Sequence, residues 1–204
     1  PDGAKLSKRH GALGVEAYEA LGYLPSGLRN YLMKLGWSHG DEELFFSDDV
    51  LAEAFSLDGI TASPARLDFD KMDYINAQHI LRKPTGELIQ SSASFLEAIN
   101  HGPLTREKQD RVMTAVETLK PRSKTLKDFA EQAEYLLTDR PLQITGKAKK
   151  SLKPEALEHL RALNTWLEAI DCDSWEANNI QTCIETYALD NDIGFGKIGQ
   201  PLRA

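Results

Sequence analysis

Three permanent cations fall within five residues near the start of the sequence, at Lys5, Lys8 and Arg9. Ser7 places a small hydroxyl between the two lysines, and glycines flank the segment on both sides. Lysine carries a compact charge on a flexible stem, so it can follow a polyphosphate whose charge distribution changes during a reaction. Glycine neighbours allow such a loop to open and close. The segment predicts a mobile phosphate clamp, and a solvated basic tail is the alternative.

Charge is unevenly distributed along the chain. The 204 residues carry a formal net charge of -7, and an acidic total argues against a nucleic-acid binder, whose surface is usually basic. Residues 120–153 nevertheless carry +5, whereas residues 154–204 carry -6. Since salt screens charges beyond roughly 8–10 Å, a nucleic acid would meet this basic segment rather than the total. Its candidate phosphate contacts are Arg122, Lys124, Lys147, Lys149 and Lys150, with a solvated linker as the alternative.

The composition is that of an ordinary globular protein, with 41% hydrophobic and 27% charged residues. No apolar run approaches the roughly 18 residues of a membrane-spanning helix, and no signal-peptide pattern is present. Cys172 and Cys183 lie eleven apart, which is neither a zinc-ligand spacing nor a disulfide framework, so we expect buried thiols in a reducing cytoplasm. The five histidines are scattered, and we expect no metal site.

The residue pattern up to position 83 predicts short helices. One covers residues 14–22, and a second begins at Pro25 with apolar residues at helical spacing. Ser47 is the expected N-cap of a third, and Asp68 or Asp70 that of a fourth, which ends near residue 81. A small strand pair at 43–46 and 60–67 is a further possibility.

Longer amphipathic helices follow, expected at 86–100, 105–119, 125–138 and 154–170. Thr105 and Thr125 are the expected N-caps of the second and third of these. Ser174 is expected to cap another helix that ends near residue 189. Three glycines after that point predict a final loop. The fold class is therefore mainly α.

The string Lys5-Leu6-Ser7-Lys8-Arg9 resembles the KMSKS signature of class I aminoacyl-tRNA synthetases, in the form typical of glutamyl-tRNA synthetases. Segments that also resemble this family are GYLP at 22–25, LRNYL at 28–32, LGWS at 35–38, FDKM at 69–72, IN at 75–76 and GKIGQPLR at 196–203. The order of these segments makes the resemblance specific. The chain is similar to the C-terminal part of a bacterial-type glutamyl-tRNA synthetase.

The resemblance implies four parts. Residues 1–13 would be the end of the catalytic domain with the signature loop, and residues 14–83 a small α(+β) stem-contact fold. Residues 84–150 and 151–204 would be two helical-bundle subdomains that bind the anticodon. Because the family normally continues beyond Arg203, we expect the last subdomain to be truncated.

The resemblance also implies the chemistry of the parent enzyme, which ligates glutamate to tRNA with ATP and Mg²⁺. Lys8 would be the principal contact to the triphosphate, supported by the rest of the signature, Lys5, Leu6, Ser7 and Arg9. No H-x-G-H string and no glycine-rich βαβ pattern are present, so we expect the chain alone to be inactive. The parent is expected to be a cytoplasmic monomer whose partner is a glutamate-specific tRNA, with the glutamine-specific tRNA as a further candidate.

For the anticodon, the motif match implies Arg203 as the main contact, with Lys197 and Gln200 in support. Splayed anticodon bases are read by hydrogen bonds and stacking, for which arginine is well suited. The alternative for Arg203 is a side chain that caps helix carbonyls. Trp37 is expected in the core rather than as a stacking platform for a base.

Three other functions compete with this interpretation. The first is a stand-alone helical RNA-binding or adaptor module, which the signature string at the start disfavours. The second is a glutaminyl-tRNA synthetase, whose β-barrel anticodon region does not fit the long helices expected here. The third is a truncated tRNA-modifying paralogue, which would lack residues 85–204.

Overall fold

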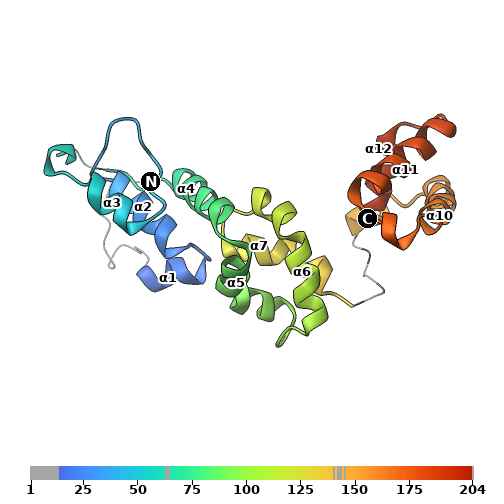
Figure 1. Cartoon of the computed structure of the whole chain (residues 1–204), viewed down its shortest axis with the longest axis horizontal. Helices are drawn as coiled ribbons and strands as arrows, with labels where there is room; N and C mark the ends of the chain where they lie inside the picture. The colour runs from blue at the N-terminus through green and yellow to red at the C-terminus, as the bar shows by residue number, and fades with distance from the viewer. Residues whose placement is uncertain (1–13, 63–64, 140, 142–143, 145, 204) are drawn as a thin grey trace. The chain divides into compact units, whose positions relative to one another are not determined.

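The computed structural model describes residues 14–62, 65–139, 141, 144 and 146–203, without the side chain of Lys147 (Figure 1). The chain divides into two compact units, residues 1–140 and 141–204. Both are helical, which confirms the predicted mainly α class. None of the helices in the described ranges combines the length and apolarity needed to cross a bilayer.

The first core of unit 1 lies between α2 (Pro25–Lys34) and α4 (Phe69–Arg82), with α1 (Val15–Ala20) preceding them. Its buried side chains are Tyr23, Leu28, Tyr31, Met72 and Ile75. Pro25 opens α2 as predicted, because a proline lacks only an N–H that has no partner in a first turn. Asp68 caps α4 by accepting the N–H of Lys71 at 3.1 Å, which confirms one of the two predicted caps.

The segment between α2 and α4 contains α3 (Asp48–Ala54) and the 3₁₀ turn η2 (Leu57–Gly59). Ser47 caps α3 as predicted. The expected strand pair is wrong, since the pairing in the described part of this segment consists of isolated bridges. Trp37 is only 4% exposed and donates its Nε1–H to the Ser56 carbonyl at 2.8 Å. The core role predicted for Trp37 is therefore confirmed, and its indole holds the η2 turn.

The second core of unit 1 is formed by α5 (Thr85–Ile99), α6 (Arg106–Leu119), α7 (Leu126–Gln132) and α8 (Glu134–Leu137), with η3 (Lys120–Arg122) after α6. Thr105 and Thr125 cap α6 and α7 as predicted. The single helix expected at 125–138 is broken at Ala133, whose N–H is shared among three carbonyls of the preceding turn. Such sharing tightens a last turn and ends the helix.

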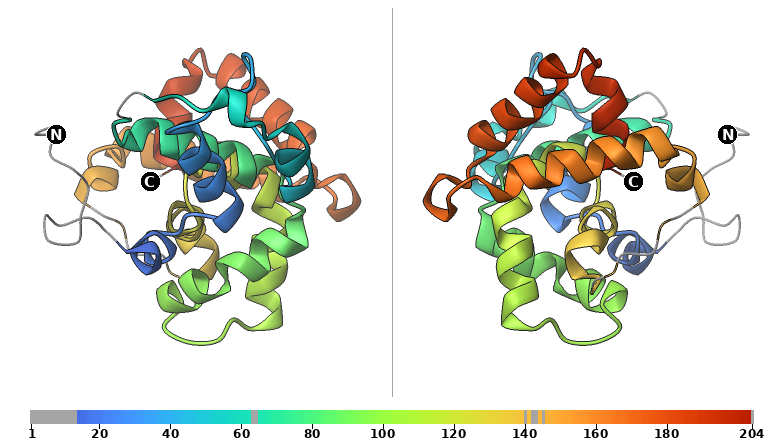
Figure 2. Two further views of the ribbon diagram at one scale, coloured as in Figure 1. Left: turned by 90° about the vertical axis from the view of Figure 1, so that its left-hand side faces the viewer. Right: turned by 90° about the vertical axis from the view of Figure 1, so that its right-hand side faces the viewer.

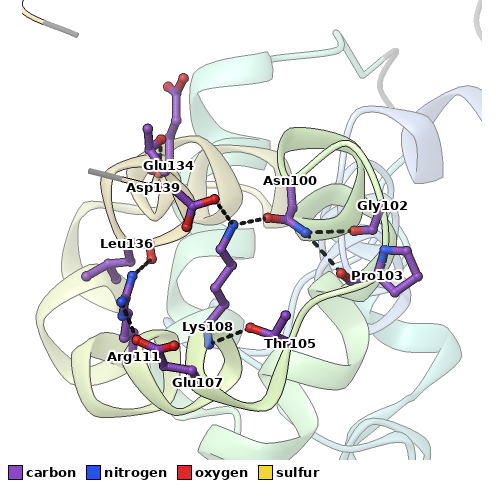
Figure 3. Close-up of polar contacts among 11 residues, drawn as sticks. Asn100, Gly102, Pro103, Thr105, Glu107, Lys108, Arg111, Glu134, Leu136 and Asp139 are labelled. Carbon is purple, nitrogen blue, oxygen red and sulfur yellow. Dashed lines mark hydrogen bonds and ion pairs between the residues drawn. The ribbon is translucent and has the colours of Figure 1, made fainter. Parts of the chain in front are cut away.

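Lys108 joins three segments at the end of unit 1 (Figure 3). Its Nζ donates to Oδ1 of Asn100 at 2.9 Å and lies 3.3 Å from Oδ2 of Asp139. The Asn100 amide in turn donates to the carbonyls of Gly102 and Pro103, each at 3.0 Å. One ammonium group thus links the α5–α6 turn to the residues after α8.

Unit 2 contains α9 (Gly146–Lys149), α10 (Pro154–Glu168), η4 (Cys172–Ser174), α11 (Ala177–Asp190) and α12 (Phe195–Leu202). Figure 2 shows α10 as the long helix against which α11 and α12 pack. Its buried core is small and comprises Leu163, Tyr187, Ala188 and Ile198.

Three expectations for unit 2 are wrong. Ser174 lies in η4 rather than at an N-cap, and Glu176 precedes α11 without a side-chain cap. Cys172 is exposed and Cys183 is partly exposed, because the small core does not reach them. The glycines at 194–199 do not form a loop: Gly194 is the N-cap of α12, which runs through the other two.

Candidate nucleic-acid interface

Helix α12 forms because its apolar residues fall on one face despite its glycines. Phe195, Ile198 and Leu202 have the spacing i, i+3, i+7; Ile198 is buried in the core of unit 2, whereas Phe195 and Leu202 at the two ends remain partly exposed. Pro201 is also buried, near the end of the helix where the missing N–H costs one intrahelical bond. Lys197 and Gln200 consequently remain on the exposed side.

These two side chains line a groove of about 490 Å³. The other lining residues come from the segment before α10, from the first turns of α10 and from the rest of α12. The lining residues are Lys150, Ser151, Lys153, Glu155, Ala156, His159, Gly196, Lys197, Gln200 and Pro201. The groove therefore brings together three predicted contacts, Lys150, Lys197 and Gln200, from segments almost fifty residues apart.

His159 is held in place at the groove by the core of unit 2. Its Nδ1 lies 3.1 Å from the hydroxyl of Tyr187, which is itself only 4% exposed. Trp166 packs edge-on against the same tyrosine ring, with centroids 5.4 Å apart. The imidazole is thus a fixed part of the wall, because its hydrogen-bond partner cannot move freely.

The groove is basic even though residues 154–204 are acidic overall. Lys150, Lys153 and Lys197 are all exposed, and Glu155 is the single acidic residue among those that line it. A cleft with charge of one sign concentrates the field and attracts ligands of the opposite sign. The local charge therefore favours an anionic ligand.

Arg203 is the C-cap of α12, one turn beyond Gln200, and its side chain is exposed. Its guanidinium has no hydrogen bond or ion pair to any residue that the structure describes, so the alternative of a carbonyl-capping arginine receives no support there. Three residues implied for the anticodon thus lie on or directly after one helix.

Of the two phosphate-contact candidates in unit 1, one is paired with a carboxylate and the other is exposed. Arg122 is exposed in η3, but the Nζ of Lys124 lies 3.3 Å from Oδ2 of Asp73. Lys149 is exposed on α9, and the side chain of Lys147 lies outside what the structure describes. The predicted phosphate contacts are therefore divided between units, and only Lys150 lies at the groove.

Residues 5–9, on which the phosphate clamp was predicted, fall outside the described ranges. Within those ranges, no three His, Cys, Asp or Glu side chains are grouped so that they could hold a metal ion. The described candidate site is therefore the groove beside α12, whose lining includes three exposed lysines and one glutamate.

Comparison with known proteins gives the family. Residues 75–204, well over half of the chain, match the family described as "Anticodon binding domain". The chain belongs to this anticodon-binding family. Residues 1–74 match the family described as "tRNA synthetases class I (E and Q), catalytic domain".

Relatives of this anticodon-binding chain are similar along its whole length. It is 46% identical to "Glutamate--tRNA ligase 2" of Maricaulis maris over 205 residues, and 41% identical to "Glutamate--tRNA ligase" of Afipia carboxidovorans over 209 residues. Both alignments cover 100% of this chain but only 42% and 44% of the relatives. The chain thus spans less than half the length of these curated relatives.

The fold is also that of a solved relative. The crystal structure of a glutamate tRNA ligase from Elizabethkingia meningosepticum, in complex with its amino acid, superposes with a TM-score of 0.78 at 25% identity. The match covers 100% of this chain and 42% of that one. The resemblance to bacterial glutamyl-tRNA synthetases inferred from the short motifs is confirmed.

Sequence reasoning did not place Lys153, His159 and Gly196 in a common site, although all three line the groove. Lys153 lies at the end of the basic segment 120–153, and Gly196 was expected in a loop although it begins the GKIGQPLR segment. The i, i+3, i+7 spacing of apolar residues from Phe195 was the available signal for α12. Nothing in the sequence places His159 beside Gly196, because that neighbourhood depends on the packing of α10 against α12.

Proposed function

We propose that the chain is the tRNA-binding part of a glutamate–tRNA ligase, which activates glutamate with ATP and transfers it to the 3′ end of tRNA. The observation that carries the proposal is the basic groove beside α12, which unites Lys150, Lys197 and Gln200 within the segment that matches the anticodon family. Arg203 extends the same helix as an exposed cation.

The groove and Arg203 have complementary tasks. Contacts to phosphates position a nucleic acid, whereas contacts to base edges specify its sequence. Arg203 is assigned to the anticodon bases, with Lys197 and Gln200 in support. Arg122, Lys124, Lys147, Lys149 and Lys150 are assigned to backbone phosphates. Binding energy gained at the anticodon, far from the reacting atoms, supports discrimination among tRNAs.

The proposal assigns a role to each part of the chain. Residues 1–13 end the catalytic domain, residues 14–83 contact the tRNA stem, and residues 84–150 and 151–204 bind the anticodon. The tRNA is the glutamate-specific one, with the glutamine-specific tRNA as a second candidate substrate. The parent enzyme acts as a monomer in the cytoplasm.

ATP is a substrate of the parent enzyme, and Lys8 is assigned to its triphosphate. Lys5, Leu6, Ser7 and Arg9 complete that loop. A positive charge held where phosphate charge develops stabilises the transition state without covalent participation by the protein. Mg²⁺ would neutralise part of the triphosphate charge, and no described residue is assigned to bind it.

Binding of an isolated glutamate anticodon stem-loop to the 204-residue chain tests the proposal. Arg203→Glu should abolish binding, because it reverses the charge at the assigned base contact. Lys149→Glu should mainly lower the slope of log K against log salt, by about one unit. Arg161→Glu is the matched control, since Arg161 is an exposed cation of α10 outside the groove. Normal binding by Arg203→Glu would show that the anticodon assignment is wrong.

Pyrophosphate exchange tests the assignment of activity to the parent. The 204 residues should show no exchange that depends on glutamate and ATP, because the nucleotide-binding half of a class I site is missing from the sequence. Turnover by this chain alone would overturn that expectation.

A further inference from the structure

Three segments of unit 1 that are far apart in the sequence meet at one place, residues 22–24, 73–76 and 124–126. The first is the turn between α1 and α2, the second lies in α4, and the third leads into α7. We call the contacts among these segments the junction. The two family matches meet between residues 74 and 75, within the second segment. The junction therefore lies where the catalytic-domain match passes into the anticodon-domain match.

The closest contact of the junction is between two stretches of backbone. The carbonyl of Gly22 accepts the N–H of Leu126 at 2.8 Å. A Cβ placed on Gly22 would lie 2.6 Å from the backbone nitrogen of Lys127, and the φ of +86° at this residue is one that side chains rarely adopt. Glycine alone satisfies both demands. Because backbone atoms cannot turn aside as a flexible side chain can, the α1–α2 turn is seated directly on the start of α7.

Side chains join the same three segments. The hydroxyl of Tyr23 donates to Oδ1 of Asp73, and Nζ of Lys124 lies 3.3 Å from Oδ2 of the same carboxylate. Burial raises the pKa of Tyr23 and the bond to Asp73 raises it further, so the phenol stays protonated and remains a donor. The Lys124 side chain is 60% exposed, so its ion pair alone contributes little. Asn76 adds one buried hydrogen bond to each of the other two segments.

Helix α4 passes through the junction without a break. It is a single helix from Phe69 to Arg82. Met72 and Ile75 belong to the first core of unit 1, and Ile80 belongs to the second. A continuous helix shared by both cores, together with the backbone contact at Gly22, leaves the two cores little freedom to turn against each other.

We infer that the junction holds residues 14–83 and residues 84–139 at a fixed angle, so that one tRNA binds both parts at once, with Gly22 and Asp73 as positioning residues. The inference rests on the proposed function, which assigns tRNA contacts to both parts. Two binding surfaces held in the geometry that a ligand requires can raise its affinity by roughly 10²–10⁴-fold over either surface alone. A rigid pair preserves this gain, because less freedom is lost on binding.

A matched pair of glycine variants tests the inference. Gly22→Ala places a methyl group against the backbone of α7, whereas Gly40→Ala places one where no atom lies within 4 Å. Both glycines have a positive φ, +86° and +52°, so both variants carry backbone strain and only the first opens the junction. Tyr23→Phe/Asp73→Asn keeps the native size but removes the hydroxyl and the carboxylate charge. It replaces Gly22→Ala if the amide spectrum shows that Gly22→Ala does not fold.

The angle between the two cores is measured first, on the 204-residue chain. Residual dipolar couplings of the amides of α2 and α6 in one alignment medium report how the two helices are oriented. One alignment tensor should fit both helices in the wild type and in Gly40→Ala. Two tensors should be needed for Gly22→Ala, because its cores turn against each other once the backbone contact is opened.

Binding is measured next, with a whole glutamate tRNA and with its isolated anticodon stem-loop. Gly22→Ala should bind the whole tRNA about tenfold more weakly than the wild type does, because the two surfaces are no longer held at the required angle. It should bind the stem-loop with wild-type affinity, since the stem-loop engages only one of the two parts. Gly40→Ala should bind both RNAs as the wild type does. A variant that has merely lost stability would instead bind both RNAs more weakly.

The outcomes separate this inference from the proposed function. If one tensor fits Gly22→Ala, the junction does not fix the angle and the inference is wrong. If two tensors are needed but whole tRNA binds normally, the inference is also wrong, and the proposed function stands. If Gly22→Ala weakens the stem-loop as much as the whole tRNA, Gly22 does not act by positioning. If the wild type binds neither RNA, the proposed function fails, and the positioning of tRNA fails with it.

Discussion

The side-chain amide of Asn76 accepts a hydrogen bond from the backbone N–H of Leu24 at 2.9 Å, across fifty-two residues of sequence. The same amide donates through Nδ2 to the carbonyl of Lys124 at 2.6 Å, and Asn76 is completely buried. One side chain thus joins the residue before α2 to the middle of α4 and to the residue before the cap of α7. The junction lies between both cores of unit 1, because α2 packs in one core, α7 in the other, and α4 contributes buried residues to both.

Asn76→Ala should destabilise unit 1 by roughly 2–4 kcal/mol. The substitution leaves a buried N–H and a backbone carbonyl without their partners, and each unsatisfied buried group costs about 1–3 kcal/mol. Urea unfolding followed by amide hydrogen exchange of α4 measures the change. Asn164→Ala is the control, because Asn164 is exposed and bonds only to Glu168 of its own helix. Equal effects of the two substitutions would contradict the role of the junction.

Gly27→Ala should also destabilise unit 1, by about 1–3 kcal/mol, because a Cβ there overlaps Oδ1 of Asn76 and lies 3.1 Å from its Cα. The backbone of α4 cannot move away without disturbing the junction. Gly86→Ala is the matched control in α5, where a Cβ meets no atom within 4 Å. That change should be neutral or stabilise by up to about 1 kcal/mol, since alanine favours a helix. The difference in unfolding free energy between the two variants checks the prediction, and a stable Gly27→Ala protein would refute it.

The caps show which parts of the fold the sequence could predict. Ser47, Asp68, Thr105 and Thr125 all cap the helices predicted for them, because a cap depends on residues only three positions apart. The junction at Asn76 could not be predicted in this way. Its partners lie 52 and 48 residues away, so the bonds exist only after the helices have packed.

Helix α12 shows why part of the groove could not be predicted from the sequence. Glycine and proline lower helix propensity, so three glycines and Pro201 favoured a loop when propensity alone was considered. Burial of Ile198 and Pro201 against the rest of unit 2 outweighs that preference. The motif that contains Lys197 and Gln200 nevertheless grouped these two residues, and both line the same groove. Only the tertiary structure shows that these two residues line one groove with Lys150 and His159.

Unit 1 should lose stability on mild acidification through His79. Its Nε2 lies 3.1 Å from Oδ1 of Asn30, an oxygen that also accepts the N–H of Phe45 at 2.8 Å. The oxygen is an acceptor, so Nε2 carries the proton of a neutral ring. Burial lowers the pKa of His79 below its ordinary 6.5, and the charge of Arg29 lowers the pKa further. The native state therefore resists protonation.

The sign of the effect follows from proton linkage. As the pH falls below about 6.5, His79 takes up a proton in the unfolded chain but stays neutral in the folded one. The unfolding free energy should then fall by up to about 1.4 kcal/mol per pH unit until the folded pKa is reached. Urea unfolding between pH 7.5 and 5 for wild type and His79→Gln measures it, since glutamine keeps a donor but does not titrate. His39 and His101 remain in both proteins, so an equal pH slope in the two would contradict the prediction.

Lys108 should stabilise the end of unit 1 mainly through Asn100 rather than through Asp139 (Figure 3). The Lys108 side chain is 15% exposed and donates to Oδ1 of Asn100, whereas the side chain of Asp139 is 83% exposed. A hydrogen bond from a charged group that is largely shielded from solvent contributes about 1.5–3 kcal/mol to stability, whereas an exposed ion pair contributes about 0–1 kcal/mol. Lys108→Met should therefore lower the unfolding free energy by about 1.5–3 kcal/mol and increase amide exchange at Gly102, because Asn100 then loses the bond that orients its amide. Asp139→Asn should change either measurement by less than half as much, and equal effects of the two variants would show that the ion pair, not the link to Asn100, holds this turn.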